Sequence, residues 1–571
     1  MVSYNYRKLD EARNQIRVVT LLPAKADKPI EIDISALSLI EDSQSSRRAL
    51  SLQEVRDRTP STWIVRETLE GRIIFESSTT DDTSWTHPDP EFDHDSITLR
   101  PEVRKNEPYE ALSYVWGPLE NLVSIFVRED NILKPLLVRQ NLFSALQHLR
   151  DVDESKTLWI DALCINQDDD EERGRQVQKM ASIYKSASRV VVWLGPEADG
   201  ASIALSTMEY TGKQSESTLD HCVLRSPESA ELDWFKPSTN LPYEEEVWTA
   251  IEKLLERAWF TRLWVRQEVQ LANEKSVIRC GKIEILWCHF RRALLCLWVK
   301  KNISRPNLAI RLRSVGSLGE DWAQFNMIQL LRAICELQCT DRRDKVYGLL
   351  GIAPSWFTAK IKPQYLLPVG EVYKQAFLVY LHQKQRLDLL RYTLHNSIRA
   401  GTPSWVADWS IPRSSDIAAN GEFASGISRA KFTIVDEDIL EVVGIEYAAV
   451  QMVKEPAPQD VHLMLDFIRE KWQSKDLQTS VYVTGESVET AYALALCAGR
   501  TLERFPTMSS YPKLEDWKNL LLSPVTAAAD VPNLNALNRL TTKTFITFHN
   551  GYIGFGPTAA LPGKSYAFHQ V

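Results

Sequence analysis

The chain has no long hydrophobic run, no secretory leader and no excess of basic charge. A membrane-spanning helix needs about 18 consecutive apolar residues, and the most apolar stretch, Val190–Leu194, is far shorter. The N-terminus lacks the apolar segment of a secretory signal. With 75 acidic against 67 basic residues, the net charge of -8 gives no general attraction to nucleic acid or anionic lipid. We therefore expect a soluble cytoplasmic protein with no membrane span and no nucleic-acid partner.

Paired cysteine motifs and the common catalytic motifs are also missing. The eight cysteines include no Cys-x-x-Cys pair, which is typical of buried thiols in a reducing compartment. Two His/Cys neighbours, at 221–222 and 288–289, do not complete a set of four at zinc spacing, so we predict no metal site. Phosphate-binding loops, zinc-protease helices and serine-hydrolase elbows have no matching segment.

The 571 residues exceed what one hydrophobic core supports, so several domains are expected. Alternating apolar residues from Ile16 to Ile34 predict a hairpin, whereas residues 42–60 are polar and resemble a linker. Four parts are expected. Residues 57–91 form a small module, 97–300 a central domain and 301–571 a mixed α+β C-terminal region. Residues 1–41 form an N-terminal hairpin segment that packs on the central domain.

The central domain alternates apolar runs with helical patterns. The runs Ala111–Trp116, Leu158–Ile160 and Val190–Leu194 are separated by helical segments at 141–149 and 171–187. This order predicts an α/β fold with a parallel sheet. A strand at Ile97–Leu99 is assigned to the same domain. Helices are also predicted at 244–257 and 263–272, and the polar stretch 197–245 is expected to be an irregular insertion.

Beyond residue 300 the pattern is helical at first and later rich in strands. Helices are predicted at 325–338 and 369–383, and strands at 432–435 and 440–445. The pair 544–548 and 552–555 flanks Asn550-Gly551, a strong hairpin signal.

Residues 60–88 contain two tryptophans, Trp63 and Trp85, on either side of a Gly-Arg turn, an aromatic residue and a Thr-rich turn. This segment resembles a WW domain. The resemblance implies a three-stranded sheet whose buckle is formed by Trp63, Phe75 and Pro88.

The ligand side of this WW-like module matches the family less well. The resemblance assigns proline binding to Thr83 and Trp85, but Ile74 replaces the partner tyrosine and Ser78 the usual histidine. Proline recognition depends on a pair of flat aromatic rings. Two alternatives remain: an adaptor for Pro-rich peptides, or a structural remnant that binds them weakly.

Three segments carry a more specific resemblance. They read Tyr109-Glu-Ala-Leu-Ser-Tyr-Val-Trp-Gly117, Leu158-Trp-Ile-Asp-Ala-Leu-Cys-Ile-Asn-Gln167 and Arg262-Leu-Trp-Val-Arg-Gln-Glu268. In order and spacing they resemble the fungal heterokaryon incompatibility (HET) domain, as do 341–351 and 403–410. The family usually runs on beyond the point where this chain ends, so we expect a shortened C-terminal domain.

The residues themselves predict where a site lies. In an open parallel sheet, functional groups gather beyond the carboxyl ends of the strands. Glu268 is the candidate catalytic carboxylate, because a carboxylate can polarise a ribose hydroxyl or stabilise an oxocarbenium-like centre. The other candidate ligand-binding residues follow the first two strands or are predicted on the helix of Glu268: Tyr114, Trp116, Gly117, Asp161, Asn166, Gln167, Arg262 and Trp264.

The resemblance implies a non-self-recognition protein that triggers programmed cell death, acting through protein partners or self-association. The HET fold is similar to the Toll/interleukin-receptor (TIR) domain, some of whose members cleave NAD with a helix-borne glutamate. The alternatives are therefore an NAD-cleaving enzyme, with NAD as substrate and no bound cofactor, or a WW-mediated adaptor. A purely structural alternative is that the tryptophans are core residues, Asp161 and Asn166 are caps, and Glu268 pairs with Arg262 or Arg266.

Overall fold

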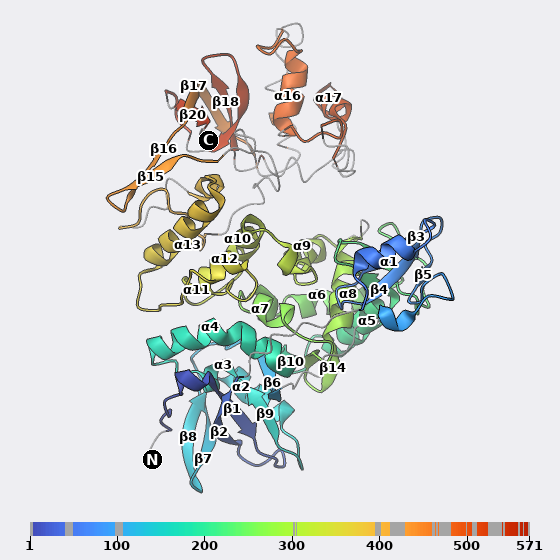
Figure 1. The fold of residues 1–571 in the computed structure, drawn as a ribbon, viewed down its shortest axis with the longest axis vertical. Helices are drawn as coiled ribbons and strands as arrows, with labels where there is room; N and C mark the ends of the chain where they lie inside the picture. Colours follow the sequence, from blue (N-terminus) through green and yellow to red (C-terminus); the bar gives the residue numbers. More distant parts are fainter. Residues whose placement is uncertain are drawn as a thin grey trace. The chain divides into compact units, whose positions relative to one another are not determined.

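The computed structural model describes residues 4–39, 49–97, 107–300, 303, 305–393, 401–411, 429–458, 463, 466–467, 481–497, 499–504, 511–522, 540, 543–557, 560–563 and 565–568. The chain divides into two compact units, Met1–Val372 and Tyr373–Val571 (Figure 1). The strand predicted around Leu99 lies outside the described residues. No helix in the described ranges is long and apolar enough to cross a membrane.

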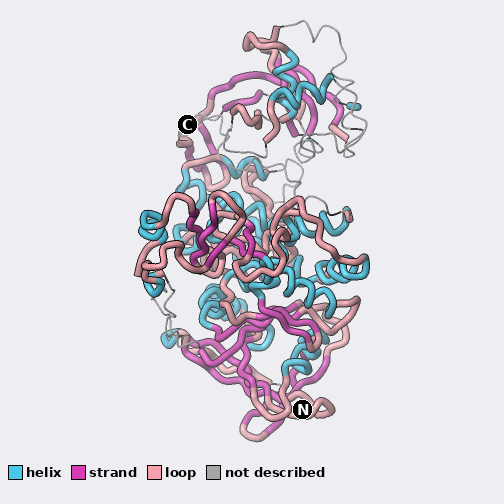
Figure 2. Tube along the Cα trace, turned by 90° about the vertical axis from the view of Figure 1, so that its right-hand side faces the viewer, coloured by secondary structure: helices cyan, strands magenta, loops and turns pink. Residues whose placement is uncertain are grey.

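The first unit is built on a nine-stranded sheet, whose strands gather beside the N-terminus in Figure 2. In spatial order they are β14 (Ile283–Leu286), β13 (Val277–Cys280), β10 (Ala187–Trp193), β6 (Glu107–Tyr114), β9 (Lys156–Trp159), β1 (Gln15–Leu21), β2 (Glu31–Ser38), β7 (Val123–Glu129) and β8 (Ile132–Val138). Strands β13, β10, β6 and β9 are mutually parallel. The three predicted apolar runs are thus neighbours in one sheet, and the predicted parallel sheet is confirmed.

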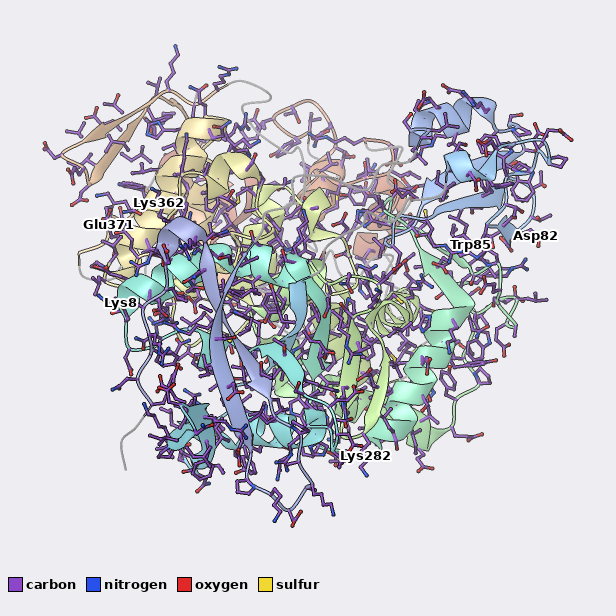
Figure 3. The ribbon with its side chains drawn as sticks, turned by 60° about the horizontal axis from the view of Figure 1, so that its bottom comes forward. Lys8, Asp82, Trp85, Lys282, Lys362 and Glu371 are labelled. Carbon is purple, nitrogen blue, oxygen red and sulfur yellow. The ribbon has the colours of Figure 1, made fainter. Side chains whose placement is uncertain are left out.

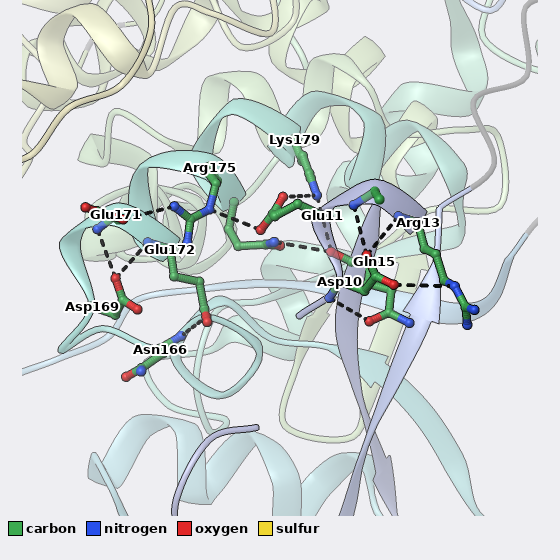
Figure 4. A network of polar contacts seen from close by, with 12 residues as sticks. Asp10, Glu11, Arg13, Gln15, Asn166, Asp169, Glu171, Glu172, Arg175 and Lys179 are labelled. Carbon is green, nitrogen blue, oxygen red and sulfur yellow. Dashed lines mark hydrogen bonds and ion pairs between the residues drawn. The ribbon is translucent and has the colours of Figure 1, made fainter. Parts of the chain in front are cut away.

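The predicted N-terminal hairpin is present and extends this sheet. Strand β1 pairs antiparallel with β2 and with β9. Its Arg17 forms an ion pair with Glu172 of helix α4 (Asp170–Ser186) at 2.5 Å, with both side chains buried. Figure 4 shows the accompanying network, in which Glu11 contacts Arg175 and Lys179 on the same helix. The N-terminal segment is therefore bonded to α4 through both buried and exposed charges.

Helices cover both faces of the sheet. Because successive side chains of a strand point to opposite faces, a strand can contact helices on both sides. On one face, the Tyr109 hydroxyl donates to the Ile183 carbonyl of α4. On the other, the Trp193 indole donates to Asn141 of α2. The helices of this unit are α1 (Leu52–Arg58), α2 (Gln140–Leu149), α3 (Asp161–Cys164), α4, α5 (Ala201–Gln214), α6 (Glu245–Leu255), α7 (Val265–Gln270), α8 (Trp287–Trp298), α9 (Pro306–Gly316), α10 (Met327–Cys335), α11 (Asp344–Tyr347) and α12 (Ser355–Thr358).

Two expectations for this region were wrong. The stretch 197–245 is not irregular: it contains α5 and a hairpin of β11 (Ser215–Ser217) and β12 (Val223–Arg225). Residues 211–218 are buried except for Lys213 although most of them are polar, so a polar composition did not indicate an exposed, irregular segment here. The helix predicted at 263–272 is confined to α7, so Arg262 precedes it in extended backbone.

Residues 60–88 form the predicted three-stranded antiparallel sheet, with β3 (Trp63–Glu67), β4 (Ile73–Ser77) and β5 (Thr83–Ser84). Phe75 is fully buried in its core, and Trp63 packs against that core while partly exposed. The His87 ring meets Phe75 edge-on at 5.1 Å and stacks on Phe92 at 3.9 Å. The ring contacts that close the module on Phe75 therefore come from His87 and Phe92, which flank the predicted buckle residue Pro88.

The second unit is mixed α+β. Its elements are α13 (Val369–Lys384, which begins in the first unit), β15 (Phe432–Val435), β16 (Ile439–Val442), β17 (Ile445–Pro456), α16 (Val488–Leu496), α17 (Leu514–Leu522), β18 (Lys543–Phe548), β19 (Ile553–Pro557) and β20 (Ser565–Phe568). Strands β19, β18, β17 and β20 form one antiparallel sheet, and β15 pairs with β16. The hairpin predicted around Asn550-Gly551 is confirmed, with Gly551 at φ +84°.

The buried Arg17–Glu172 pair gives the first prediction. Arg17→Ala should lower the free energy of unfolding by about 3–5 kcal/mol, because it leaves the Glu172 carboxylate buried without its partner. Urea denaturation of the full chain measures the change. Arg175→Ala, which removes a half-exposed arginine from α4, is the control and should cost less than about 1 kcal/mol. Equal losses in the two variants would contradict the prediction.

Candidate functional site

The candidate site begins at the carboxyl end of β6. Because side chains alternate along a strand, Ser113 and Tyr114 point to opposite faces of the sheet. Ser113 faces α7, and Tyr114 lies on the side of Asp161, which follows the neighbouring strand β9. The end of one strand thus contacts two carboxyl groups from distant segments.

Glu268 is the first of these carboxyl groups. It lies on α7 with 1% of its surface exposed. The Ser113 hydroxyl donates to Glu268 Oε2, and the Trp259 indole donates to Ser113 Oγ at 2.8 Å. Ser113 and Trp259 were not among the predicted site residues. A lone serine within the apolar run of β6 was the available signal.

The arginines expected to pair with Glu268 bond to backbone oxygens. Arg262 donates to the Tyr114 carbonyl, and Arg266 donates to the Ser314 carbonyl at 3.3 Å. Burial therefore raises the pKa of Glu268 to about 7, although the positive charge of Arg262 lowers it in part. Glu268 is a carboxyl group that changes protonation near neutral pH.

Asp161 is the second carboxyl group. It accepts hydrogen bonds from the Trp116 indole at 2.7 Å, from the Ala162 amide at 2.7 Å and from the Tyr114 hydroxyl. Burial raises the pKa of Asp161, and Arg262 opposes that rise. The same guanidinium thus faces both carboxyl groups, and Asp161 in turn raises the pKa of Glu268.

The remaining residues after β6 and β9 have local roles. The amide of Asn166 donates to Glu172 at 2.8 Å, and its side-chain oxygen accepts from the Asp168 amide at 3.3 Å in a local turn, whereas the N-cap of α4 is Asp169. Gln167 donates to the Asp161 carbonyl at 3.1 Å. Gly117 has φ +76°, a conformation that favours glycine, and its carbonyl accepts from Arg139.

Trp264 belongs to a different cluster from Glu268, although both were predicted on the same helix. Its indole donates to Asp344 Oδ2 at 3.1 Å, and the Tyr365 hydroxyl donates to Asp344 Oδ1 at 2.8 Å. Burial raises the pKa of Asp344 to about 6, even with these two donors. Trp264 therefore connects the start of α7 to residues 344–365, a role that its position in the sequence did not reveal.

The structure therefore brings together Tyr114, Trp116, Asp161, Arg262 and Glu268. Burial raises the pKa of both Glu268 and Asp161, and the positive charge of Arg262 only partly opposes that rise. A carboxyl with a pKa near the working pH can donate or accept a proton. Trp116, Asp161 and Arg262 are partly exposed, whereas Glu268 is buried. Within the described ranges, no three His, Cys, Asp or Glu side chains gather as metal ligands.

The expected peptide-binding residues of the small module are engaged within the chain. Thr83 donates to the Arg225 carbonyl at 2.9 Å, and the Arg72 guanidinium lies 3.5 Å from the centre of the Trp85 ring. Figure 3 shows Asp82 and Trp85 on the side of the module that faces the rest of the unit, and Asp82 pairs with Arg225 at 2.8 Å.

A proline-rich ligand would have to displace these contacts, so we predict weak binding. Titration of the full chain with a Pro-Pro-x-Tyr peptide should show no saturation at low-micromolar concentration. The same peptide with its prolines replaced by alanine is the control. A low-micromolar dissociation constant that depends on the prolines would contradict the prediction.

The raised pKa of Glu268 predicts a pH-dependent stability difference. A carboxyl whose pKa is 4.5 when unfolded and about 7 when folded stabilises the fold in its protonated form. That advantage is fully present below pH about 4.5 and is lost as the pH rises through about 7. Glu268→Gln keeps the acceptor for Ser113 and carries no charge. The variant should exceed the wild type by less than about 1 kcal/mol at pH 5 and by on the order of 3 kcal/mol at pH 8.

Urea unfolding at both pH values measures the gain, and Glu171→Gln on the exposed side of α4 controls for the general loss of one charge. A gain that is equal at pH 5 and pH 8 would show that Glu268 is ionised at both.

Residues 109–268 match the family "Heterokaryon incompatibility protein (HET)". The chain is also 27% identical over 361 residues to "Heterokaryon incompatibility protein 6, OR allele" of Neurospora crassa. That alignment covers 53% of this chain and 53% of the relative, so the chain matches about half of the relative's length. No solved structure matches the chain significantly. Residues 109–268, which contain both carboxyl groups and Arg262, are therefore a heterokaryon incompatibility (HET) domain.

Proposed function

We propose that this chain is a fungal heterokaryon incompatibility protein that acts in the cytoplasm. In this role it responds to a non-self partner after cell fusion and triggers programmed cell death through assembly with other protein chains. The HET family match and the name of the Neurospora relative support the incompatibility role. The death signal and its assembly are the parts that the experiment below tests.

The observation that carries the proposal is the convergence of the three HET segments on one buried polar cluster. The first segment contributes Ser113 and Tyr114, the second contributes Asp161, and the third contributes Arg262 and Glu268. Buried charged clusters are often no more stabilising than apolar residues of similar volume. Stability alone does not account for two carboxyls and one guanidinium here, so we assign the cluster to signalling.

A second candidate function is NAD cleavage at the same cluster. The observation in its favour is the pKa of Glu268 near 7, which suits a residue that stabilises charge or moves a proton at a ribose. The partly exposed Trp116, Asp161 and Arg262 would then contact the dinucleotide. Against it stands the depth of Glu268, which has 1% of its surface exposed and would have to become accessible for chemistry.

Expression of the full chain in fungal cells tests the role of the cluster. We predict that the wild type kills and that Glu268→Gln lowers killing by at least about tenfold, a loss equivalent to one interaction of 1.4 kcal/mol. Protein abundance should stay normal, because the variant keeps the hydrogen bond from Ser113. Glu171→Gln is the matched control and should kill like the wild type.

Cellular NAD, measured before viability falls, separates the two candidates. Killing without NAD loss supports signalling through assembly. NAD loss that Glu268→Gln abolishes selects the enzyme instead. If Glu268→Gln kills normally, or acts only by lowering protein abundance, Glu268 has a structural role and the proposal fails.

A further inference from the structure

Two turns in the first unit have the same local sequence pattern and conformation. One follows β3 and reads Arg66-Glu-Thr-Leu-Glu-Gly-Arg72; the other follows β11 and reads Glu216-Ser-Thr-Leu-Asp-His-Cys222. We call them the module turn (66–72) and the insert turn (216–222). In each, the threonine amide donates to the carbonyl four residues later, at 2.8 and 3.0 Å. Positive φ values occur at matching positions, +80° at Gly71 and +64° at His221.

The two turns bind each other with a local two-fold relation. Thr68 and Thr218 form an antiparallel bridge. On one side the Leu69 amide donates to the Ser217 carbonyl at 2.9 Å. On the other the Leu219 amide donates to the Glu67 carbonyl, also at 2.9 Å. Each turn therefore presents the same donor and acceptor to its partner.

Their charges do not share this symmetry. On one side of the bridge, Arg66 of the module turn forms an ion pair with Asp220 of the insert turn. At the equivalent place on the other side, Glu70 faces Glu216. Both carboxyl groups are largely buried, with 12% and 2% of the side chain exposed. The two turns thus pair one attractive contact with one repulsive contact.

Two arginines of α8 offset the repulsion. Arg292 bridges the two carboxyls, at 3.0 Å to Glu70 and 2.8 Å to Glu216, and Arg291 holds Glu70 at 2.7 Å. Burial raises the pKa of Glu216 to about 7, while Arg291 and Arg292 overcome the burial of Glu70 and lower its pKa to about 2. The two carboxyl groups are therefore held side by side by charges that neither turn supplies.

The docked contact also leaves polar groups without partners. Among the described residues, four buried polar atoms where the two turns meet α8 have no hydrogen-bond partner: Ser217 Oγ, Glu216 Oε2, Arg291 Nε and Arg292 Nε. A buried polar group without a hydrogen bond costs about 1–3 kcal/mol. The contact between the two turns and α8, which we call the junction, is thus polar, and some of its buried polar atoms lack hydrogen bonds.

From this geometry we propose that the module turn is a self-complementary docking element, and that its second partner is the module turn of another copy of this chain. In such a pair the same two-fold backbone contacts form, and Arg66 of each copy faces Glu70 of the other. Both side contacts are then attractive. Two insert turns would instead place Glu216 opposite Asp220 twice, which electrostatic repulsion disfavours.

Docking within one chain normally prevents the pairing between chains. The insert turn is held at a high effective concentration relative to the module turn of the same chain. The wild type is therefore monomeric, and the pairing between copies appears when the internal contact is weakened. This inference supplies a partner and a surface for the assembly in the proposed function. Its test does not measure toxicity, so the two can fail separately.

The test weakens the internal contact from the exposed side. Asp220 has half of its side chain exposed and forms an ion pair with Arg66. Asp220→Arg therefore replaces this attraction by repulsion between two arginines. The full-length variant should sediment with close to twice the monomer mass as its concentration rises. In hydrogen exchange the Leu219 amide should exchange faster by about tenfold or more, while the Leu69 amide stays protected in the dimer. Asp153→Arg, at an exposed loop position, controls for the change in net charge.

Two double variants separate the internal pairing from the pairing between copies. Asp220→Arg with Arg66→Glu restores the internal ion pair with its charges exchanged and should return a monomer with both amides protected. Asp220→Arg with Glu70→Arg places Arg66 opposite an arginine in the pairing between copies, so this variant should be monomeric.

A dimer that survives the Glu70→Arg change would overturn the proposal, as would a monomeric Asp220→Arg variant with its module folded. Circular dichroism and protection of the strand amides of β4 establish that the module is folded. If Asp220→Arg unfolds the module, Arg292→Gln opens the same contact from α8 and has the same two outcomes.

Discussion

A single guanidinium, that of Arg262, faces two carboxyl groups at the end of β6. It donates to the Tyr114 carbonyl, and its positive charge lowers the pKa of both Glu268, on one face of the sheet, and Asp161, on the other. That one charge does not cancel the effect of burial, which raises the pKa of both carboxyl groups. The arrangement depends on β6 ending at this point, because the alternation of Ser113 and Tyr114 sends one residue to each carboxyl.

The junction of the small module repeats this electrostatic problem with another solution. There two carboxyl groups, Glu70 and Glu216, also lie close together in a buried place. Two arginines from α8 are available, and Glu70 stays ionised with a pKa of about 2. Burial nevertheless raises the pKa of Glu216 to about 7, as it does for Glu268. The two arginines therefore lower the pKa of one carboxyl group of the junction pair, whereas at the end of β6 burial raises the pKa of both carboxyl groups.

Part of this structure was predictable from the sequence, and the physical reasons differ by element. Apolar runs revealed the parallel strands β6, β9 and β10, since strands buried on both faces consist mainly of apolar residues. The rule that groups gather beyond the carboxyl ends of strands placed Asp161 and Arg262 together. It failed for Trp264, whose partner Asp344 is distant in the sequence. Strand β11 was missed because its three residues are polar yet buried, and their partners lie in α8 and the module.

The segment matched by the HET family ends at Glu268, but the position of Glu268 depends on residues beyond it. Gln338 exchanges backbone hydrogen bonds with Thr261 and Leu263, at 2.7 and 2.8 Å, on either side of Arg262. Trp264, at the start of α7, is held by Asp344. At the other end of the chain, β1 extends the sheet beside β9 and joins α4 through the Arg17–Glu172 pair. The smallest part of the chain that can hold Glu268 in place therefore includes residues on both sides of 109–268. It corresponds to the compact unit that ends at Val372.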